Sequence, residues 1–215
     1  MNKVKTVSEL KNQRVAAAFT EWTFSRVVEE IEGIIEDKKQ VKHSQIQKRI
    51  ESCLDNDTIM AKFKAECDHQ FLDFPLPVLI QSGGDFAVNK FQVDSNDDKL
   101  QSQAIYINVC GKYCDMSAMA SRTIIVNPKD EQKAAYILAY EAEDLLIKSL
   151  KPGVKISDAY NQVKKHIAEN NPNVVLGSNF GFGIGFLFKE DALAINGTNH
   201  TIVEQGMTFH VRIAF

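Results

Sequence analysis

The chain has 215 residues, 44% of them hydrophobic, and a formal net charge of −3 at pH 7. This length allows one large or two small domains, and the charge excludes a strongly basic surface over the chain as a whole. No apolar run approaches the roughly 20 residues that cross a bilayer. The first residues lack the apolar centre of a signal peptide, so we expect a cytosolic or nuclear protein without a membrane partner.

The charges are distributed unevenly along the chain. Residues 1–50 contain ten Lys or Arg and seven Asp or Glu, whereas residues 51–100 contain four and ten. An acidic surface formed by the second segment would attract basic partners. A solvated surface with no partner is the alternative interpretation of the same charges.

The first third of the chain is predicted to be helical. Apolar residues recur every three to five positions from Glu9 to about Asp37, with Ser8 as the N-cap. Ser44 opens a second predicted helix, and residues 56–68 form a third. We therefore predict that residues 1–73 form an N-terminal helical segment leading into a lobe of residues 74–215.

The middle of the chain changes from helical to β patterning. Two prolines end the helical pattern, and a buried strand is predicted from Val78 to Gln81. A short strand is predicted at residues 91–98. Residues 105–110 and 123–126 are runs rich in β-branched residues, and they predict the two strands of a hairpin.

The last part of the chain predicts two helices followed by further strands. The helices cover residues 130–150 and 158–169, and strands are expected at 179–188, 192–195 and 208–215. The chain stops within that last strand, which would leave its edge and its apolar side chains exposed. We therefore expect a fragment whose lobe is truncated at its C-terminal end.

The glycines of the predicted strand at 179–188 do not form a nucleotide-binding motif. Gly181, Gly183 and Gly185 alternate with Phe and Ile, and no helix opens behind them. We expect them to let two backbones approach closely within a sheet.

The five histidines and four cysteines form no recognisable catalytic or zinc-binding pattern. His43 and His166 are expected to be exposed on helices, whereas His210 alternates with apolar neighbours and would point into a pocket. Cys110 and Cys114 lie close in sequence but have no second ligand pair nearby. Buried free thiols are the preferred interpretation of the cysteines.

The order of elements from Phe74 to Phe215 resembles the pita-bread fold shared by methionine aminopeptidase, prolidase, aminopeptidase P and creatinase. The hairpin ending Ser-Arg-Thr-Ile-Ile-Val and the Gly206-Met207 turn carry the likeness. The resemblance implies an α+β pita-bread (creatinase/aminopeptidase-like) fold, which is a mixed antiparallel sheet with helices packed on one face.

The same resemblance assigns ligand and catalytic positions residue by residue. The two metal-binding aspartates of the hairpin fall on Asn108 and Met119, the metal-binding histidine on Phe182, and one metal-binding glutamate on Arg212. The fifth ligand would lie beyond Phe215. The two substrate-handling histidines fall on Lys90 and Lys189.

These substitutions predict a fold without enzymatic activity. Two divalent ions close together need several carboxylates to offset their repulsion and to supply hard oxygen ligands. An amide, a thioether, a phenyl ring and a guanidinium do not supply them, so we expect no metal and no other cofactor. A salt bridge from Arg212 to an acidic residue would fill the vacated space. An active metal-dependent aminopeptidase or proline peptidase is the alternative.

Within this fold, five segments resemble the large subunit of the FACT histone chaperone complex. They are residues 8–37, the Phe-Pro-Leu-Pro-Val-Leu-Ile-Gln-Ser-Gly-Gly stretch, residues 121–126, residues 150–157 and the Gly-Phe-Gly-Ile-Gly segment. The resemblance implies a catalytically inactive peptidase-like module that binds histones or other chromatin proteins in the nucleus, on chromosomes. It also implies no sequence-specific DNA binding, and contacts to the smaller FACT subunit through parts of a longer protein.

The former substrate cleft is the first candidate for a peptide-binding site in such a module. Its candidate residues are Lys90, Asn108, Met119, Phe182, Lys189 and Arg212. Three of these side chains are cationic and would oppose a basic peptide, so the acidic segment 51–100 is the alternative docking surface.

Overall fold

The computed structural model describes residues 3–84, 86 and 93–214. The chain forms two compact units, one made of Met1–Leu10 with Pro128–Phe215 and the other of Lys11–Asn127. The boundary expected at residue 73 rests on sequence patterning, and it stays a prediction.

Helix α1 (Val7–Glu36) begins in the first unit and continues through the second. Its N-terminus is capped by Thr6 and not by Ser8 as expected. The backbone N–H of Glu9 donates to the Thr6 hydroxyl at 3.3 Å, and the Glu9 carboxylate accepts from the Thr6 N–H at 2.7 Å. These bonds lower the pKa of Glu9. Such a reciprocal pair satisfies two of the N–H groups that every helix start leaves free.

The rest of the Lys11–Asn127 unit contains short helices and four strands. The helices are α2 (His43–Glu51), η1 (Ser52–Asp55), α3 (Asp57–Met60) and η2 (His69–Phe71), and the strands are β1 (Leu72–Asp73), β2 (Leu79–Ser82), β3 (Ala104–Tyr113) and β4 (Met116–Ile125). The helix expected at 56–68 is therefore a single turn. The strand expected at 91–98 has no β structure over 93–98, and residues 91 and 92 lie outside the described part.

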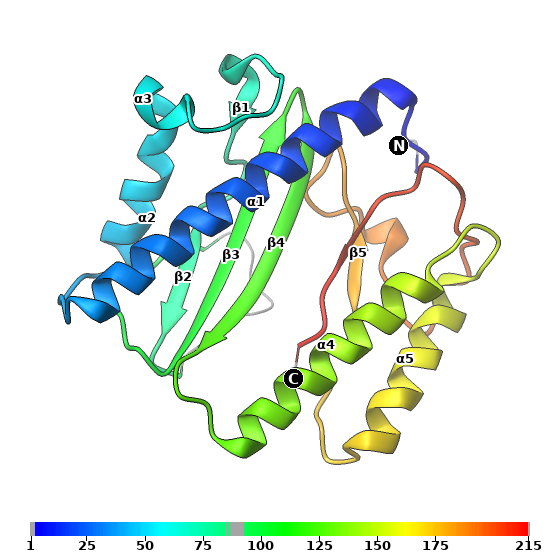
Figure 1. Cartoon of the computed structure of the whole chain (residues 1–215). Coiled ribbons are helices and arrows are strands. Elements are labelled where there is room, and N and C mark those ends of the chain that lie inside the picture. The colour runs from blue at the N-terminus through cyan, green and yellow to red at the C-terminus, as the bar shows by residue number, and fades with distance from the viewer. Residues whose placement is uncertain (1–2, 85, 87–92, 215) are drawn as a thin grey trace. The chain divides into compact units, whose positions relative to one another are not determined.

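The four strands form one antiparallel sheet around β3, as Figure 1 shows. Strand β4 pairs with the whole of one edge of β3, from Ala104 opposite Ile125 to Tyr113 opposite Met116. The other edge pairs with β2 at one end and β1 at the other. Every described pairing in the sheet is antiparallel, and β3 is its central strand, with the equally long β4 on one side and the short β1 and β2 on the other.

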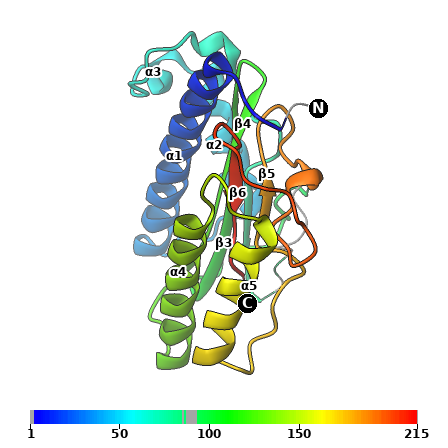
Figure 2. The same ribbon diagram turned by 90° about the vertical axis from the view of Figure 1, so that its right-hand side faces the viewer.

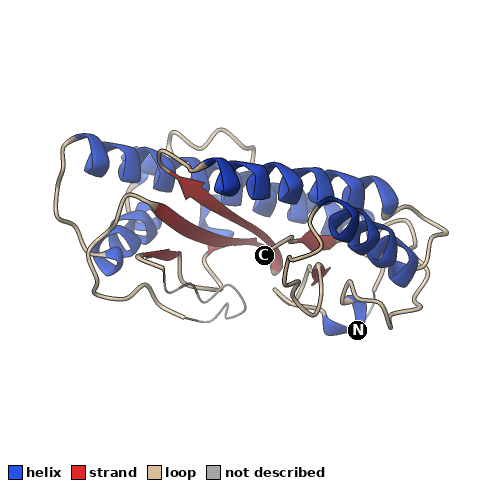
Figure 3. Ribbon diagram, turned by 90° about the horizontal axis from the view of Figure 1, so that it is seen from below, coloured by secondary structure: helices blue, strands red, loops and turns tan. Residues whose placement is uncertain are grey.

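Helix α1 packs against one face of this sheet. Val27, Ile31 and Ile34 of the helix share a core cluster with Ile107 and Val109 of β3. Figure 3 shows the long helix and the hairpin strands as separate layers within this unit. Apolar residues recur with the helical period in α1 and alternate in β3, so each element has an apolar face. These two faces pack together in the core of this unit.

The other unit packs two helices against short β structure. Its elements are α4 (Asp130–Ser149), α5 (Ile156–Asn170), β5 (Gly181–Gly183), η3 (Asp191–Leu193) and β6 (Phe209–Val211). Helices α4 and α5 lie side by side in Figures 1 and 2, and their buried faces share one apolar cluster. The strand expected at 192–195 is instead a turn of 3₁₀ helix. In the described part of the chain, no helix is long and apolar enough to cross a membrane.

Candidate functional site

The central hairpin presents two faces of different character. The side chains of Ile107 and Val109 point toward helix α1, so the even-numbered residues of β3 point to the opposite face. Cross-strand register pairs Asn108 with Ser121 and Cys110 with Met119. These four residues, called the hairpin face below, therefore lie together on the side away from α1.

Asn108 is fully buried on the hairpin face. Its Oδ1 accepts a hydrogen bond from the Ser121 hydroxyl at 2.7 Å. Its Nδ2 is buried as well and has no hydrogen-bond partner among the described residues. A buried amide donor without a partner is costly, by about 1–3 kcal/mol, and it presents partial positive charge at this place.

Cys110 lies beside Asn108 on the same face and is also fully buried. Burial raises the pKa of its thiol to about 12. Burial likewise raises the pKa of Cys53 to about 11, within the core cluster that holds Phe19 and Phe63. Both cysteines are free, as expected from the sequence.

Because the pKa values of these two thiols are raised, we predict that the free energy of unfolding falls at high pH. Unfolded cysteines release their protons near pH 8.5, whereas the folded chain keeps both protons to about pH 11. Above pH 8.5 the unfolded state therefore binds fewer protons, and the free energy of unfolding falls as pH rises. We expect a loss of about 2 kcal/mol per thiol between pH 8 and 10, measured by urea unfolding.

A variant with Cys53→Ala and Cys110→Ala tests the assignment of that loss. It should be less stable at pH 7, because two packed side chains become smaller, but its stability should fall less between pH 8 and 10. Equal pH dependence in the two proteins would show that other groups, such as lysines and tyrosines, cause the loss.

Strands β5 and β6 bring together three candidate residues in the other unit. Phe182 is buried and lies opposite His210, with ring centroids 5.2 Å apart. The Lys189 ammonium lies 6.0 Å from the centre of the Phe182 ring and forms a 2.9 Å salt bridge with Asp191. The backbone N–H of Arg212 donates to the Phe180 carbonyl at 2.9 Å.

The close approach of two backbones predicted for these glycines is found at Gly181, whereas Gly183 and Gly185 leave room for neighbouring side chains. An added Cβ at Gly181 would lie 2.0 Å from the carbonyl oxygen of His210, and Gly181 has a φ of +131°. A Cβ at Gly183 would lie 2.7 Å from Leu193, and one at Gly185 would lie 2.3 Å from Lys5. A side chain at any of the three positions would therefore clash, and the group that it would meet differs from one position to the next.

Gly185 borders a buried ion pair that the sequence did not reveal. The Lys5 ammonium lies 2.7 Å from both carboxylate oxygens of Glu190, and the two side chains are only 4% and 5% exposed. The backbone N–H of Lys5 also donates to the Gly206 carbonyl at 2.9 Å. The pair joins the N-terminal segment to the loop behind the glycine-rich strand.

His43 is fully buried, and not exposed as the sequence predicted. Its Nδ1 lies 2.7 Å from the Asn96 side-chain oxygen, and its Nε2 lies 2.7 Å from the Ser82 hydroxyl. The Ser82 hydroxyl also accepts from the backbone N–H of Gln101 at 2.8 Å. His43 thereby joins the start of helix α2 to Asn96 and to the Ser-Gly-Gly turn.

The six candidate site residues divide between the two units. Asn108 and Met119 share the hairpin face in one unit, while Phe182, Lys189 and Arg212 belong to the other. Lys90 lies outside the described residues. Within the described part of the chain, no group of three or more His, Cys, Asp or Glu side chains is placed to hold a metal ion.

Proteins of a known family share this arrangement of strands and helices. The model of metallopeptidase family M24 matches residues 11–215. The chain belongs to metallopeptidase family M24. The fold of this M24 domain is like that of the X-Pro aminopeptidase of Thermotoga maritima, with a TM-score of 0.77 and 22% identity over 97% of this chain and 54% of that one. The expected α+β pita-bread fold is confirmed.

Other similar proteins are FACT complex subunits by name. The N-terminal domain of FACT complex subunit SPT16 from Cicer arietinum (chickpea) matches with a TM-score of 0.90 and 31% identity, over 97% of this chain and 49% of that one. FACT complex subunit SPT16 of Oryza sativa subsp. japonica is 30% identical over 98% of this chain. FACT complex subunit ctc-2 of Neurospora crassa is 27% identical over 99% of it.

The M24 domain spans only part of these relatives. It covers 20% of the rice protein and 22% of the Neurospora protein. The resemblance to FACT large subunits predicted from the sequence is confirmed over nearly the whole chain, and what the longer relatives do is a separate question.

Proposed function

We propose that this M24 domain is a protein-binding module of a FACT-type histone chaperone and not a peptidase. The similarity of nearly the whole chain to SPT16 subunits is the observation that carries this proposal. The module would act in the nucleus, on chromosomes, and support nucleosome reorganisation during transcription and replication. The smaller FACT subunit and other chromatin proteins would bind parts of the longer protein outside this chain.

The chemistry of the hairpin face supports the loss of metal-dependent hydrolysis. The family resemblance assigns two ligand positions to Asn108 and Met119. A pair of divalent ions needs carboxylates there, and an amide with a thioether offers neither the charge nor the hard oxygens. The buried Nδ2 of Asn108 adds a donor where a cation would need an acceptor. The residues do not fit the metal pair, so we derive no hydrolytic step through it.

The glycine-rich strand supports the same conclusion within its own unit. Phe182, at the position assigned to a metal-binding histidine, is buried against His210 and has no ligand atom. Arg212, at a position assigned to a glutamate, would place a positive charge near cations. Lys189 replaces a substrate-handling histidine and pairs with Asp191.

The acidic segment 51–100 is the surface we propose for histones, because histones are basic and the former cleft carries Lys189 and Arg212. Eight acidic residues of this segment are exposed in the described part of the chain: Asp55, Asp57, Glu66, Asp68, Asp73, Asp94, Asp97 and Asp98. Such a surface speeds association with a positively charged partner and loses effect as salt screens it. No sequence-specific DNA binding is proposed.

Calorimetric titration with purified core histones tests this function. We expect micromolar or tighter binding at low salt that weakens as the salt concentration rises. The double variant Asp55→Asn, Glu66→Gln should weaken it roughly threefold or more by removing two exposed charges. No heat at micromolar protein and low salt would end the proposal for this chain.

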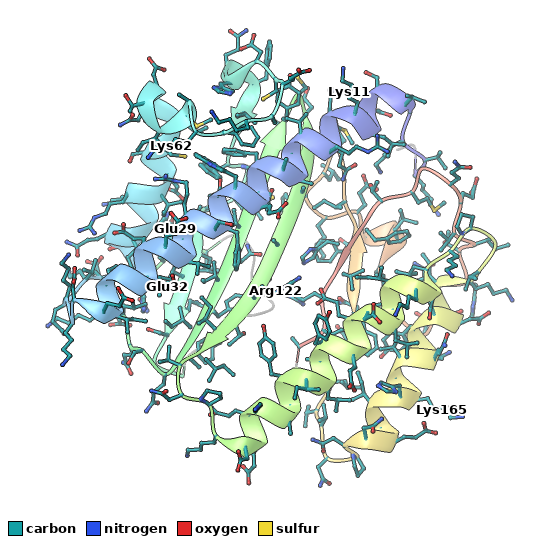
Figure 4. The ribbon with its side chains drawn as sticks, viewed as in Figure 1. Lys11, Glu29, Glu32, Lys62, Arg122 and Lys165 are labelled. Atoms are coloured by element: carbon teal, nitrogen blue, oxygen red, sulfur yellow. The ribbon has the colours of Figure 1, made fainter. Side chains whose placement is uncertain are left out.

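A second double variant separates docking on this segment from a general effect of net charge. Glu29 and Glu32, labelled on α1 in Figure 4, are exposed acidic residues outside the segment. The variant Glu29→Gln, Glu32→Gln changes the net charge by the same amount. Equal weakening by both double variants would refute docking on residues 51–100 and leave only non-specific attraction.

The alternative, an active aminopeptidase or proline peptidase, has its own measurement. Elemental analysis after incubation with manganese or cobalt, followed by assays on dipeptides with proline in the second position, should show neither stoichiometric metal nor turnover. Bound metal together with turnover would establish the enzyme instead.

A further inference from the structure

The four cysteines fall into two classes. Cys53 and Cys110 are fully buried. Cys67 and Cys114 are partly exposed and lie in the same unit. Only the second pair is open to a soluble oxidant, because reaction of a thiol requires access as well as ionisation.

The segments that carry Cys67 and Cys114 are packed together. Strand β1 pairs with the end of β3, and the backbone N–H of Cys114 extends this pairing by donating to the Phe71 carbonyl at 3.3 Å. The backbone N–H of Asp68 donates to the Tyr113 hydroxyl at 3.4 Å. The chain neighbours of both cysteines are therefore in direct contact across a separation of more than 40 residues.

The side chains of this region form one cluster. Cys67 and Tyr113 pack against the same apolar group around Phe63 and Leu72. Burial, then the Asp68 carboxylate and the Cys114 thiol, raise the pKa of Cys67. The Tyr113 hydroxyl interacts with the thiols of both cysteines. Each of the two thiols therefore lies within electrostatic range of the other.

Cys114 also occupies an unusual backbone conformation. It has a φ of 44° and Asp115 a φ of 67°, at the turn between β3 and β4. A two-residue turn of this kind favours Asn-Gly, because non-glycine residues are strained at positive φ. Cys114 therefore combines three features: a strained backbone, partial exposure and a second thiol nearby.

We propose that Cys67 and Cys114 are joined by a reversible disulfide when the protein meets a peroxide. The bond would fasten the segment before β1 to the tip of the β3–β4 hairpin. In a reducing compartment such a bond is transient and serves as a redox signal rather than as a permanent cross-link.

The reaction balances with hydrogen peroxide as the oxidant. The Cys114 thiolate attacks a peroxide oxygen, the O–O bond breaks, and sulfenic acid and water form after proton transfer. The Cys67 thiolate then attacks the sulfenyl sulfur, the S–O bond breaks, and a second water leaves as the disulfide forms. Two thiols lose two hydrogen atoms, and one peroxide yields two waters. The balance and the product are the same if the two thiols exchange roles.

Peptide mapping of the whole chain without reduction tests the proposal. After treatment with hydrogen peroxide we expect one intrachain linked peptide containing Cys67 and Cys114, which disappears on addition of dithiothreitol. The oxidised chain should melt roughly 5 °C or more above the reduced chain, because the bond closes a long loop. Cys67→Ser and Cys114→Ser should each abolish both effects.

The wild-type map alone decides the matter if either variant fails to fold. Peptides in which Cys67 and Cys114 carry separate sulfinic acids, with no linked peptide, would overturn the proposal. Linkage between two chains, or linkage through Cys53 or Cys110, would overturn it as well, because the geometry assigns the bond to one pair within one chain.

Discussion

The Gly181→Ala substitution should lower the free energy of unfolding of its unit by about 3–5 kcal/mol. Two separate costs add at this position. Alanine is strained at a φ of +131°, and its Cβ would lie 2.0 Å from the carbonyl oxygen of His210. Because that oxygen belongs to the backbone of the paired strand, relief requires β5 and β6 to separate. Thermal unfolding followed by circular dichroism measures the loss.

Gly177→Ala is the matched control for this prediction. It lies just before the same strand and is exposed, and an added Cβ there meets only the Asn179 carbonyl oxygen, at 3.7 Å. We expect its melting temperature to stay near that of the unchanged chain. If both alanine variants melt alike, the close approach of the two strands is not a determinant of stability.

Lys5→Met should destabilise the chain by about 3–5 kcal/mol by leaving a buried carboxylate without its partner. Glu190 is almost fully enclosed, and both its oxygens lie 2.7 Å from the Lys5 ammonium. The methionine fills a similar volume but offers no charge. Denaturant unfolding of the two proteins at the same pH and salt measures the difference.

The double variant Lys5→Met, Glu190→Met completes a double-mutant cycle, which measures the interaction free energy between the two side chains. Removing both charges removes the cost of burying them, so much of the lost stability should return. Lys148→Met serves as the control, because its salt bridge with Asp144 is exposed and should have little effect on melting. A loss for Lys5→Met no larger than that for Lys148→Met would contradict the inference of a buried, coupled pair.

The hairpin and the long helices are the elements that local sequence patterns predicted well. Apolar residues alternate in β3 and recur every three to five positions in α1, so each pattern repeats within its own segment. Segments with little repetition were predicted poorly. A strand was expected at residues 192–195, where the structure has the 3₁₀ turn Asp191–Leu193, and the helix expected at residues 56–68 is the single turn Asp57–Met60.

The sequence by itself also shows which residues occupy the positions that the family resemblance assigns to metal ligands. The amide of Asn108, the thioether of Met119 and the phenyl ring of Phe182 are evident without a structure, and so is their unsuitability as ligands for a metal pair. The environment of each is not evident. Only the structure shows that Asn108 bonds to Ser121 and that Phe182 packs against His210.

By itself, then, the sequence determined which faces of the long helices are apolar, where glycine is required in the last strands, and which chemistry the assigned positions lack. The tertiary structure alone decided that His43 is buried against Ser82 and that Lys5 pairs with Glu190 across 185 positions. The physical reason is the separation along the chain of the residues that interact. Periodicity and turn preference act between near neighbours, whereas burial of a charge or a histidine depends on distant segments that remove water from it and supply its partner.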